Sequence, residues 1–593
     1  MGGERRGGAG SLNDFANRVT GRSDAVLCRL VVETLSGKGR HEPYKPRGLR
    51  TDLWGTGGET PPVYPACDRP TLAAGGAGLR SGARLLRRSP PQGSERWGRE
   101  LGRGSESISD PVFGAGSLSA LIVPLTSGNA AQADPIEESG APLYRIARGQ
   151  HGGALKPANV STKQERIAAL AKNNPEMAFY NLNQYIDYEW VHYAYQCTRK
   201  DGAVGVDDQT AEDYAANLEQ NLLALVDQLK SGSYHAPPVR RHYIPKADGS
   251  GERGLGIPCF ADKVAQRAIV MLLEPIYEQT FADCSYGFRP GRSAHQALQA
   301  VRGSIMERGG RWVLDVDLRK YFDSIDPAKL REFLARRVTD GVVRRLIDKW
   351  LKAGVFEDGQ VHYPETGTPQ GGVVSPCLAN VFLHYVLDEW FADQVQPRLR
   401  GASTLVRFAD DFVVVFARQD DAERVLRVLG KRMGKYGLQL HPDKTRLVDF
   451  RRKRKPTAAS GETERATIFH FLGFVHVWGR SRKGNIVVRQ QTAKDRFART
   501  LKAINEKCRR LRHEPLPDQH RQLSQTLTGH FAYFGISGNA KRLSALRYYA
   551  RRIWRKWLSR RSTKSQVSWD RFSQIEARFP LPQPRIFHRY AGL

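Results

Sequence analysis

The chain contains little cysteine and no long hydrophobic run. Its 593 residues include seven Cys, which are scattered and never spaced as Cys-x-x-Cys. This argues against a disulfide framework and against a zinc site built on paired thiols, and it fits a reducing compartment. The most apolar early stretch, Leu118–Leu125, is far too short to cross a bilayer. The amino terminus also lacks a secretory apolar core, so we expect no membrane partner, while an organellar transit peptide stays open.

Acidic residues are scarce relative to basic ones. The sequence has 92 Lys and Arg against 61 Asp and Glu, a formal net charge of +31. Such a surplus points to a polyanionic partner, and nucleic acid fits better than a membrane surface. The excess is steepest in residues 491–593, which hold 23 Lys and Arg against 6 Asp and Glu.

One segment of this basic region, Leu546–Arg561, carries an apolar stripe at helical spacing, which predicts inward packing of that face. Cations crowd its other faces, and their density favours phosphate contact over an ordinary solvated face. The residues predicted to contact nucleic acid here are Arg547, Arg551, Arg552, Arg555 and Lys556.

Composition divides the chain into unlike parts. Residues 1–155 are rich in Gly, Ser, Pro and Arg with little periodicity, so we predict a disordered extension; a basic arm that grips nucleic acid is the alternative. Helical patterns and a hairpin follow over 156–300, strands alternate with helices over 301–480, and basic helices fill 485–593. These patterns together predict an α+β fold.

Capping and breaking residues give the limits of the predicted helices. Thr210 and Ser293 are predicted N-caps, and Gly232 and Pro275 are predicted helix ends. The predicted helices are Gln164–Lys172, Glu176–Tyr195, Ala211–Leu229, Asp262–Glu274, Ala294–Arg302, Cys377–Trp390 and Glu423–Tyr436.

Two adjacent carboxylates, Asp410 and Asp411, lie between Val- and Phe-rich runs in Leu405–Phe416. The flanks predict two strands joined by a tight turn. Asp is common in turns, so an ordinary hairpin tip would explain the pair by itself. However, neighbouring carboxylates held between apolar strands repel each other unless a cation lies between them. Mg²⁺ suits this place because it binds one or two carboxylates together with substrate phosphates.

A third carboxylate comes from the predicted strand Trp312–Leu318, whose alternation places Asp315 and Asp317 on one face. A solvent-facing sheet edge would also carry acids, but the Val and Leu neighbours favour a site. Pairing this strand with the hairpin would bring Asp317 beside Asp410 and Asp411. Three carboxylates could then hold two Mg²⁺ about 3.5–4 Å apart, as in phosphoryl transfer.

Cations that could hold phosphates occur in two further segments. Lys246 and Arg253 lie on opposite arms of a predicted hairpin and could converge on one anion, although two solvated surface charges explain these residues better when taken alone. Arg289 and Arg292 lie in the loop Ser285–Ser293, whose aromatic residues and glycines suit a sugar-phosphate backbone. Solvated charge beside a turn is the alternative there.

Taken in order, these motifs resemble the group II intron-encoded reverse transcriptases, also called maturases, over about residues 160–590. Each motif is modest alone, whereas their order and spacing together are highly specific. The motifs are Ile244-Pro245-Lys246 with Arg253, the Ser285–Arg292 loop, the strand with Asp317 and Phe322, Thr368-Pro369-Gln370-Gly371-Gly372, Phe408-Ala409-Asp410-Asp411, Lys444-Thr445 and Phe471–Phe474.

The resemblance implies a right-hand polymerase. N-terminal helices and fingers would span 156–300, a palm with an antiparallel sheet 301–480, and an α-helical thumb, or maturase domain, 485–593. The implied activity is RNA-directed DNA synthesis on intron RNA, with assistance to splicing and mobility. The implied partners are the intron RNA, an RNA template–DNA primer duplex, a DNA target and deoxynucleoside triphosphates. A bacterial cytoplasm is the expected location, and an organelle stays open.

The resemblance also implies roles for individual residues. The carried-over ligands of two catalytic Mg²⁺ are Asp317, Asp410 and Asp411. The carried-over nucleotide-binding residues are Lys246 and Arg253 at the triphosphate, Phe322 under the sugar and Gln370 along the pocket.

The sequence departs from the family pattern in two places. Phe408 stands where Tyr is usual, and Gly254 stands where Pro usually follows the Arg; neither change removes a ligand. No Cys/His cluster follows residue 491, so we expect no zinc-dependent nuclease module. Members of the family that cut the second DNA strand carry such a module, so the resemblance implies priming on nicked or single-stranded DNA here. Two alternatives stay open: a splicing-only RNA-binding maturase, and a reverse transcriptase of the retron or diversity-generating type.

Overall fold

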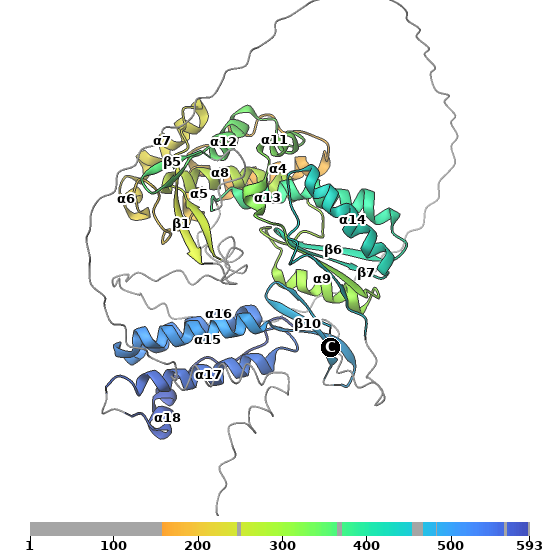
Figure 1. Cartoon of the computed structure of the whole chain (residues 1–593). Helices are drawn as coiled ribbons and strands as arrows, with labels where there is room; N and C mark the ends of the chain where they lie inside the picture. Colours follow the sequence, from red (N-terminus) through yellow and green to blue (C-terminus); the bar gives the residue numbers. More distant parts are fainter. Residues whose placement is uncertain are drawn as a thin grey trace, which may run out of the picture. The chain divides into compact units, whose positions relative to one another are not determined.

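The computed structural model describes residues 157–245, 251–363, 371–452, 467–481, 483–562 and 566–590. The predicted disordered extension, residues 1–155, lies outside the described residues, as do Lys246 and Gln370. The described parts combine helices with three sheets (Figure 1). The predicted mixture of helix and sheet is therefore confirmed.

The central sheet has the strand order β6-β7-β3-β8, and all its pairs are antiparallel. β6 and β7 form the predicted hairpin. β3 pairs with β7, which is the pairing predicted to bring Asp317 beside Asp410 and Asp411. The strands are β3 (Trp312–Val316), β6 (Ser403–Phe408), β7 (Asp411–Phe416) and β8 (Arg446–Asp449).

Different helices cover the two faces of the central sheet. On one face, Val313 and Val413 pack in the same core as α9 (Ala294–Met306). On the other face, Leu314 and Val414 pack in the same core as α14 (Gln419–Lys435). Figure 1 shows the two helices on opposite sides of β6 and β7. Because side chains alternate along a strand, Asp411 belongs to the same face as Val413.

Helices dominate the chain before the central sheet. They are α4 (Ala158–Asn173), α5 (Tyr188–Cys197), α6 (Ala211–Ala216), α7 (Leu218–Ser231) and α8 (Phe260–Tyr277). The predicted helix Glu176–Tyr195 was wrong in its first half. Asp187 caps α5 by accepting a hydrogen bond of 3.0 Å from Trp190 N, and Phe179 instead forms a bridge with Val338.

The predicted helix Ala211–Leu229 is two helices in the structure, divided at Asn217. Thr210 caps the first as expected, and Gly232 ends the second with a φ of +80°. The prediction that Pro275 ends its helix was wrong, because α8 continues to Tyr277. Proline cannot donate to the carbonyl four residues earlier, and Gln164 Nε2 satisfies that carbonyl, Met271 O, at 3.0 Å instead.

A second sheet has the order β2-β1-β4-β5, and its predicted hairpin β1–β2 is confirmed. Its strands are β1 (Val239–Pro245), β2 (Glu252–Ile257), β4 (Val355–Glu357) and β5 (Gln360–His362). The helices near it in sequence are α10 (Tyr321–Ser324), α11 (Pro327–Ala335), α12 (Gly341–Leu351) and α13 (Ser375–Leu383). α13 continues into a π-helical turn, His384–Asp388.

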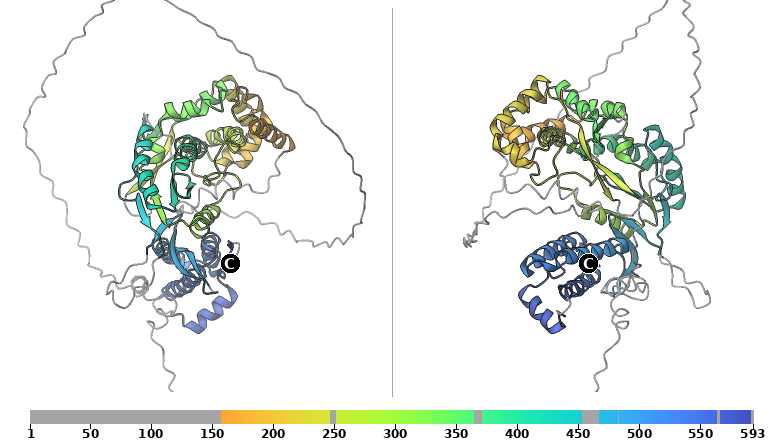
Figure 2. Two further views of the ribbon diagram at one scale, coloured as in Figure 1. Left: turned by 90° about the vertical axis from the view of Figure 1, so that its right-hand side faces the viewer. Right: turned by 60° about the vertical axis from the view of Figure 1, so that its left-hand side comes forward.

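The third sheet, of order β11-β10-β9, leads directly into the C-terminal helices (Figure 2). Its strands are β9 (Phe469–Phe471), β10 (Phe474–Arg480) and β11 (Ile486–Thr492). The helices are α15 (Lys494–Arg510), α16 (Leu516–Phe534), α17 (Ala540–Leu558) and α18 (Trp569–Arg578). The apolar stripe predicted on α17 packs inward, with Leu546, Ala550 and Ile553 all buried.

Candidate active site

The β6–β7 hairpin ends in a two-residue turn made of Ala409 and Asp410. Phe408 and Asp411 are the last paired residues, so the predicted tight turn is confirmed. Ala409 has a φ of +57°, a conformation that costs free energy for any residue with a Cβ and that hairpin turns usually assign to glycine. The two carboxylates thus lie at a strained tip whose geometry must be held by its surroundings.

The register of the sheet places Asp317 across from this tip. The last pair of β3 and β7 is Val316 with Phe412, so the next residue, Asp317, stands opposite Asp411. Directly opposed side chains of an antiparallel pair share one face of the sheet. Asp315, two residues earlier, lies on the same face. Asp315, Asp317 and Asp411 therefore share the α9 face of the sheet near the end of the hairpin, with Asp410 in the adjoining turn.

The electrostatics of these acids agree with the register. Desolvation by the surrounding protein raises the pKa of Asp411 well above its ordinary value, and the charges of Asp315, Asp410 and Asp317 raise it further. Desolvation also raises the pKa of Asp410. The charge of Arg253 lowers this pKa, and the charge of Asp317 raises it. Carboxylates in such positions repel one another, and a cation would relieve the repulsion.

The donor set fits a hard divalent cation, although the side chains are not arranged as a finished site. Among the described residues, no three His, Cys, Asp or Glu side chains converge closely enough to hold a metal ion as they stand. Lys444 Nζ lies 3.3 Å from Asp317 Oδ2, and Arg446 Nε lies 3.2 Å from Asp315 Oδ2. Carboxylate oxygens are the ligands that Mg²⁺ prefers. In this structure Lys444 balances the charge of Asp317, and Arg446 balances that of Asp315.

Arg253 is the predicted triphosphate ligand that the structure describes. It is exposed on β2, opposite Ile244 of β1, and its charge lowers the pKa of Asp410 against the larger effect of desolvation. An arginine distant in sequence is therefore near enough to the turn to act on its charge. Its predicted partner Lys246 lies outside the described residues, so their convergence stays a prediction.

Phe322 lies in α10, half-buried, five residues after Asp317. Its ring meets that of Tyr321 edge-on, with 5.4 Å between centroids. Tyr321 is itself anchored by a 2.7 Å hydrogen bond from its hydroxyl to Ala379 O. The position of the Phe322 ring is thus defined by packing, while its role against a sugar stays a prediction.

Gln370 lies outside the described residues, but the loop that follows it is anchored. Gly371 has a φ of +118°, and a Cβ there would lie 2.3 Å from Gly256 O on β2. Val374 N donates to Gln266 Oε1 on α8 at 3.1 Å. This loop therefore packs closely against β2, the strand that carries Arg253.

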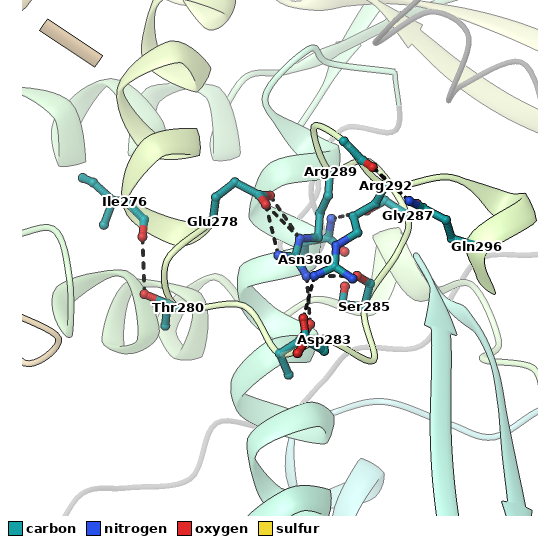
Figure 3. A network of polar contacts seen from close by, with 12 residues as sticks. Ile276, Glu278, Thr280, Asp283, Ser285, Gly287, Arg289, Arg292, Gln296 and Asn380 are labelled. Atoms are coloured by element: carbon teal, nitrogen blue, oxygen red, sulfur yellow. Dashed lines mark hydrogen bonds and ion pairs between the residues drawn. The ribbon is translucent and has the colours of Figure 1, made fainter. Parts of the chain in front are cut away.

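The structure uses Arg289 differently from the prediction. Its side chain is 4% exposed, and the guanidinium donates to both Glu278 oxygens, at 3.0 and 3.2 Å from Nε. Nη1 donates to the carbonyls of Ala282 and Ser285 at 2.8 and 2.9 Å (Figure 3). These bonds engage Arg289 inside the protein, where it holds the loop together, and its contact with phosphate stays a prediction. Arg292 is more accessible and pairs with Asp283 at 2.6 Å.

The five cations predicted on α17 are also partly engaged within the protein. Arg547 and Arg551 both pair with Glu576 of α18, at 3.2 and 2.5 Å. Arg552 donates to Tyr548 Oη at 2.8 Å, and Arg555 donates to Val567 O at 2.6 Å. Lys556 Nζ lies 5.4 Å from the centre of the Trp557 ring. Contact of these residues with phosphate stays a prediction. No local pattern in the sequence indicated Glu576 as the partner of Arg547 and Arg551.

Two residues near the site were missed by reasoning from the sequence. Arg496, in the first turn of α15, interacts electrostatically with Asp411 and packs close to Gly473 in the turn between β9 and β10. Gly287 lies against the strained turn, where a Cβ would come within 2.3 Å of Ala409 N. Glycine is common where two backbones approach closely, and this is the sign that could have pointed to Gly287.

Residues 244–476, which include β2 and the acids Asp317, Asp410 and Asp411, match the family model described as reverse transcriptase (RNA-dependent DNA polymerase). The protein YkfC of Escherichia coli K12 is 32% identical over 388 residues, covering 59% of this chain and 97% of that protein. The group II intron-encoded protein LtrA of Lactococcus lactis is 39% identical over 224 residues, which is 37% of each chain.

The chain belongs to the group II intron-encoded reverse transcriptases and maturases. Its enzyme class is RNA-directed DNA polymerase, and reverse transcriptase domains generally use divalent metal ions. The nuclear intron maturase 1 of Arabidopsis thaliana mitochondria is also similar, with 34% identity over 104 residues and 14% of that protein covered. Within the described parts of the chain, every helix is too short or too polar to span a membrane.

Proposed function

We propose that this protein copies group II intron RNA into DNA with two Mg²⁺ and assists the splicing and mobility of that intron. The observation that carries the proposal is the register of β3 and β7, which sets Asp317 opposite Asp411 beside the Asp410 turn. Two adjoining carboxylates at a hairpin tip and a third on the neighbouring strand are the ligand set that two-metal phosphoryl transfer needs. Membership of the reverse transcriptase family agrees with this chemistry.

In this proposal the described elements take the parts of a right-hand polymerase. The helices α4–α9 with the β1–β2 hairpin would be the N-terminal region and fingers, the central sheet the palm, and α15–α18 the thumb. The three acids would then lie in the palm with the exposed Arg253 facing them from the fingers. A primer end and a triphosphate could meet at the hairpin tip.

Each protein group has a distinct task in catalysis. Asp317, Asp410 and Asp411 would hold the ions, and Asp317 would exchange its pairing with Lys444 for that role. The chemistry supplied at this place when Mg²⁺ is bound is activation of the primer 3′-hydroxyl for in-line attack on the α-phosphate, with stabilisation of the leaving pyrophosphate. Arg253 would neutralise phosphate charge, because a guanidinium forms charge-assisted hydrogen bonds with phosphate oxygens.

The remaining predicted residues would select and hold substrates. Phe322 would pack beneath the sugar and exclude a 2′-hydroxyl, with Lys246 at the triphosphate and Gln370 along the pocket. The basic surface of α17 and Arg292 would hold intron RNA, the template–primer duplex and the DNA target through their phosphates. We place the protein where intron RNA is made, in a bacterial cytoplasm or an organelle.

The test is substitution of one acid with a matched control. Asp410→Ala should abolish primer extension on an RNA template and leave intron RNA binding unchanged, because the acid serves the ions and not the RNA. Asp227→Ala, an exposed acid on α7, should leave both intact. Undiminished DNA synthesis by Asp410→Ala would refute the assignment of the metal ligands.

A splicing maturase that no longer polymerises is the second candidate. It would bind intron RNA without DNA synthesis, and the retained Asp317, Asp410 and Asp411 favour the enzyme. The intron-associated names of several relatives favour the intron class over a retron or diversity-generating type. Primer extension and intron splicing, measured with one protein preparation, distinguish the polymerase from a maturase that only assists splicing.

A further inference from the structure

A fully buried arginine lies directly behind the strained turn. Arg407 precedes Phe408 on β6, and its side chain and that of Asp388 are both 0% exposed. Arg407 pairs across the hairpin with Phe412, which packs on the α14 side of the sheet, whereas Asp411 belongs to the α9 side. The arginine therefore supports the turn from the face opposite the acid.

All five N–H groups of Arg407 have partners. Nε and Nη2 donate to the two oxygens of Asp388 at 2.8 and 2.5 Å, and Nη2 also donates to Ser285 Oγ at 2.7 Å. Nη1 donates to Asn380 Oδ1 at 2.9 Å and to Ala409 O at 3.0 Å. A buried charge is costly unless it is paired and fully hydrogen-bonded, so this set leaves the guanidinium one defined position.

The same network reaches the turn from a second side. Asn380 Nδ2 donates to Gly287 O at 2.7 Å (Figure 3), and the backbone of Gly287 lies against Ala409 N. The loop also pairs directly with β6, since Arg407 N donates to Cys284 O and Tyr286 N donates to Arg407 O, both at 2.8 Å. The carbonyl of Ala409 is thus held by the arginine, and its amide is confined by Gly287.

We propose that Arg407, oriented by Asp388, Asn380 and Ser285, is a positioning residue that holds Ala409 in its left-handed conformation and so places Asp410 and Asp411 against Asp317. It acts through the backbone and touches neither substrate nor ion. This positioning role rests on the proposed function, which assigns Asp317, Asp410 and Asp411 as metal ligands. A lysine in its place could not serve these partners together, since an ammonium group has three donors and no planar fork.

The test compares two buried arginines in the full chain. Arg407→Lys should lower kcat for primer extension about tenfold or more and raise the Mg²⁺ concentration for half-maximal rate several-fold, because ligands displaced by a fraction of an ångström lose alignment. Intron RNA binding should not change. The control is Arg337→Lys: Arg337 is 3% exposed and donates to the carbonyls of Ala171 and Asn174, with no bond to the turn.

The control separates positioning from simple loss of stability. Both lysine variants leave buried acceptors without their partners, so both should melt at a lower temperature. Only Arg407→Lys should shift the Mg²⁺ requirement, and an equal kcat and Mg²⁺ midpoint for the two variants would overturn the proposal. If Arg407→Lys does not fold, Ser285→Ala, which removes one bond from the guanidinium, takes its place with the same comparison and a smaller shift expected.

Asp410→Ala, measured in the same assay, distinguishes failure of the positioning role from failure of the proposed function. If Asp410→Ala is inactive while Arg407→Lys behaves like the control, the acids are the ligands and the arginine does not position them. If Asp410→Ala still synthesises DNA, the metal assignment itself is wrong, and the positioning role is overturned with it.

Discussion

Gly287 offers the most direct test of how tightly the catalytic turn is confined. A Cβ at this position would lie 2.3 Å from Ala409 N and 2.9 Å from Phe408 C. Ordinary van der Waals contact begins near 3.4 Å, so Gly287→Ala requires a relative movement of about 1.1 Å between the loop and the turn. Both groups are backbone, and neither can move away by rotating a side chain.

The expected result of Gly287→Ala is a large loss of activity with a moderate loss of stability. A displacement of about 1 Å in a catalytic arrangement can cost on the order of 100-fold in rate. Forcing one extra methyl group into a packed region usually costs about 1–3 kcal/mol of unfolding free energy. The measurements are steady-state primer extension on an RNA template at saturating Mg²⁺ and thermal melting of the same protein.

Gly291→Ala is the matched control, since it lies in the same loop. Gly291 has a φ of +75°, and nothing lies within 4 Å of a Cβ built there. Alanine at that position would cost about 1 kcal/mol through left-handed strain without touching the hairpin. If Gly287→Ala extends primers as fast as Gly291→Ala, the reasoning that this contact positions the turn is wrong.

Three further outcomes are expected. Phe322→Ala should raise ribonucleotide incorporation relative to deoxynucleotide roughly tenfold or more, because a steric contact with the 2′-hydroxyl is removed; unchanged sugar selection in competition assays would exclude Phe322 from the pocket. Intron RNA binding should weaken by about 10³–10⁵ between 50 and 200 mM salt if 6–10 phosphates are contacted, and a flat response in filter binding would count against the basic C-terminal helices as the RNA grip. Burial lowers the pKa of His295 to about 4, with the charge of His588 adding to the fall and the Tyr533 carbonyl opposing it. The unfolded chain then binds more protons than the folded chain below pH 6.5, so the unfolding free energy should fall by up to about 3 kcal/mol as pH drops from 6.5 to 4. Denaturant titrations of His295→Gln should show a smaller dependence of the unfolding free energy on pH. An unchanged dependence would mean that other groups cause it.

Local pattern was enough to predict the elements that carry the site. The Val- and Phe-rich flanks of Asp410 and Asp411 predicted the hairpin, and alternation around Asp317 predicted its strand, because a half-buried strand has a side-chain period of two. The pairing of those strands was inferred from the need of a metal site for a third carboxylate, and the register confirmed the pairing. The errors in helix limits came from tertiary contacts, as when Gln164 satisfies the carbonyl that Pro275 leaves unpaired.

The roles of the arginines could not be predicted in the same way. Arg289 and Arg292 are three residues apart in one loop, yet one is enclosed by Glu278 and two carbonyls while the other remains accessible. Whether a guanidinium meets a phosphate or a protein carboxylate depends on what packs against it. That partner lies at a sequence distance that no local pattern encodes.

The sequence by itself determined the presence of the three acids, the strands that bear them and the family to which they belong, because these depend on residue type and short-range spacing. Only the tertiary structure decided that Arg407, a single charge inside a hydrophobic strand, is enclosed by Asp388, Asn380 and Ser285. It also decided that Gly287 confines Ala409. Both are contacts between distant segments, whose geometry arises only when the core has excluded water and leaves each buried polar group one set of partners.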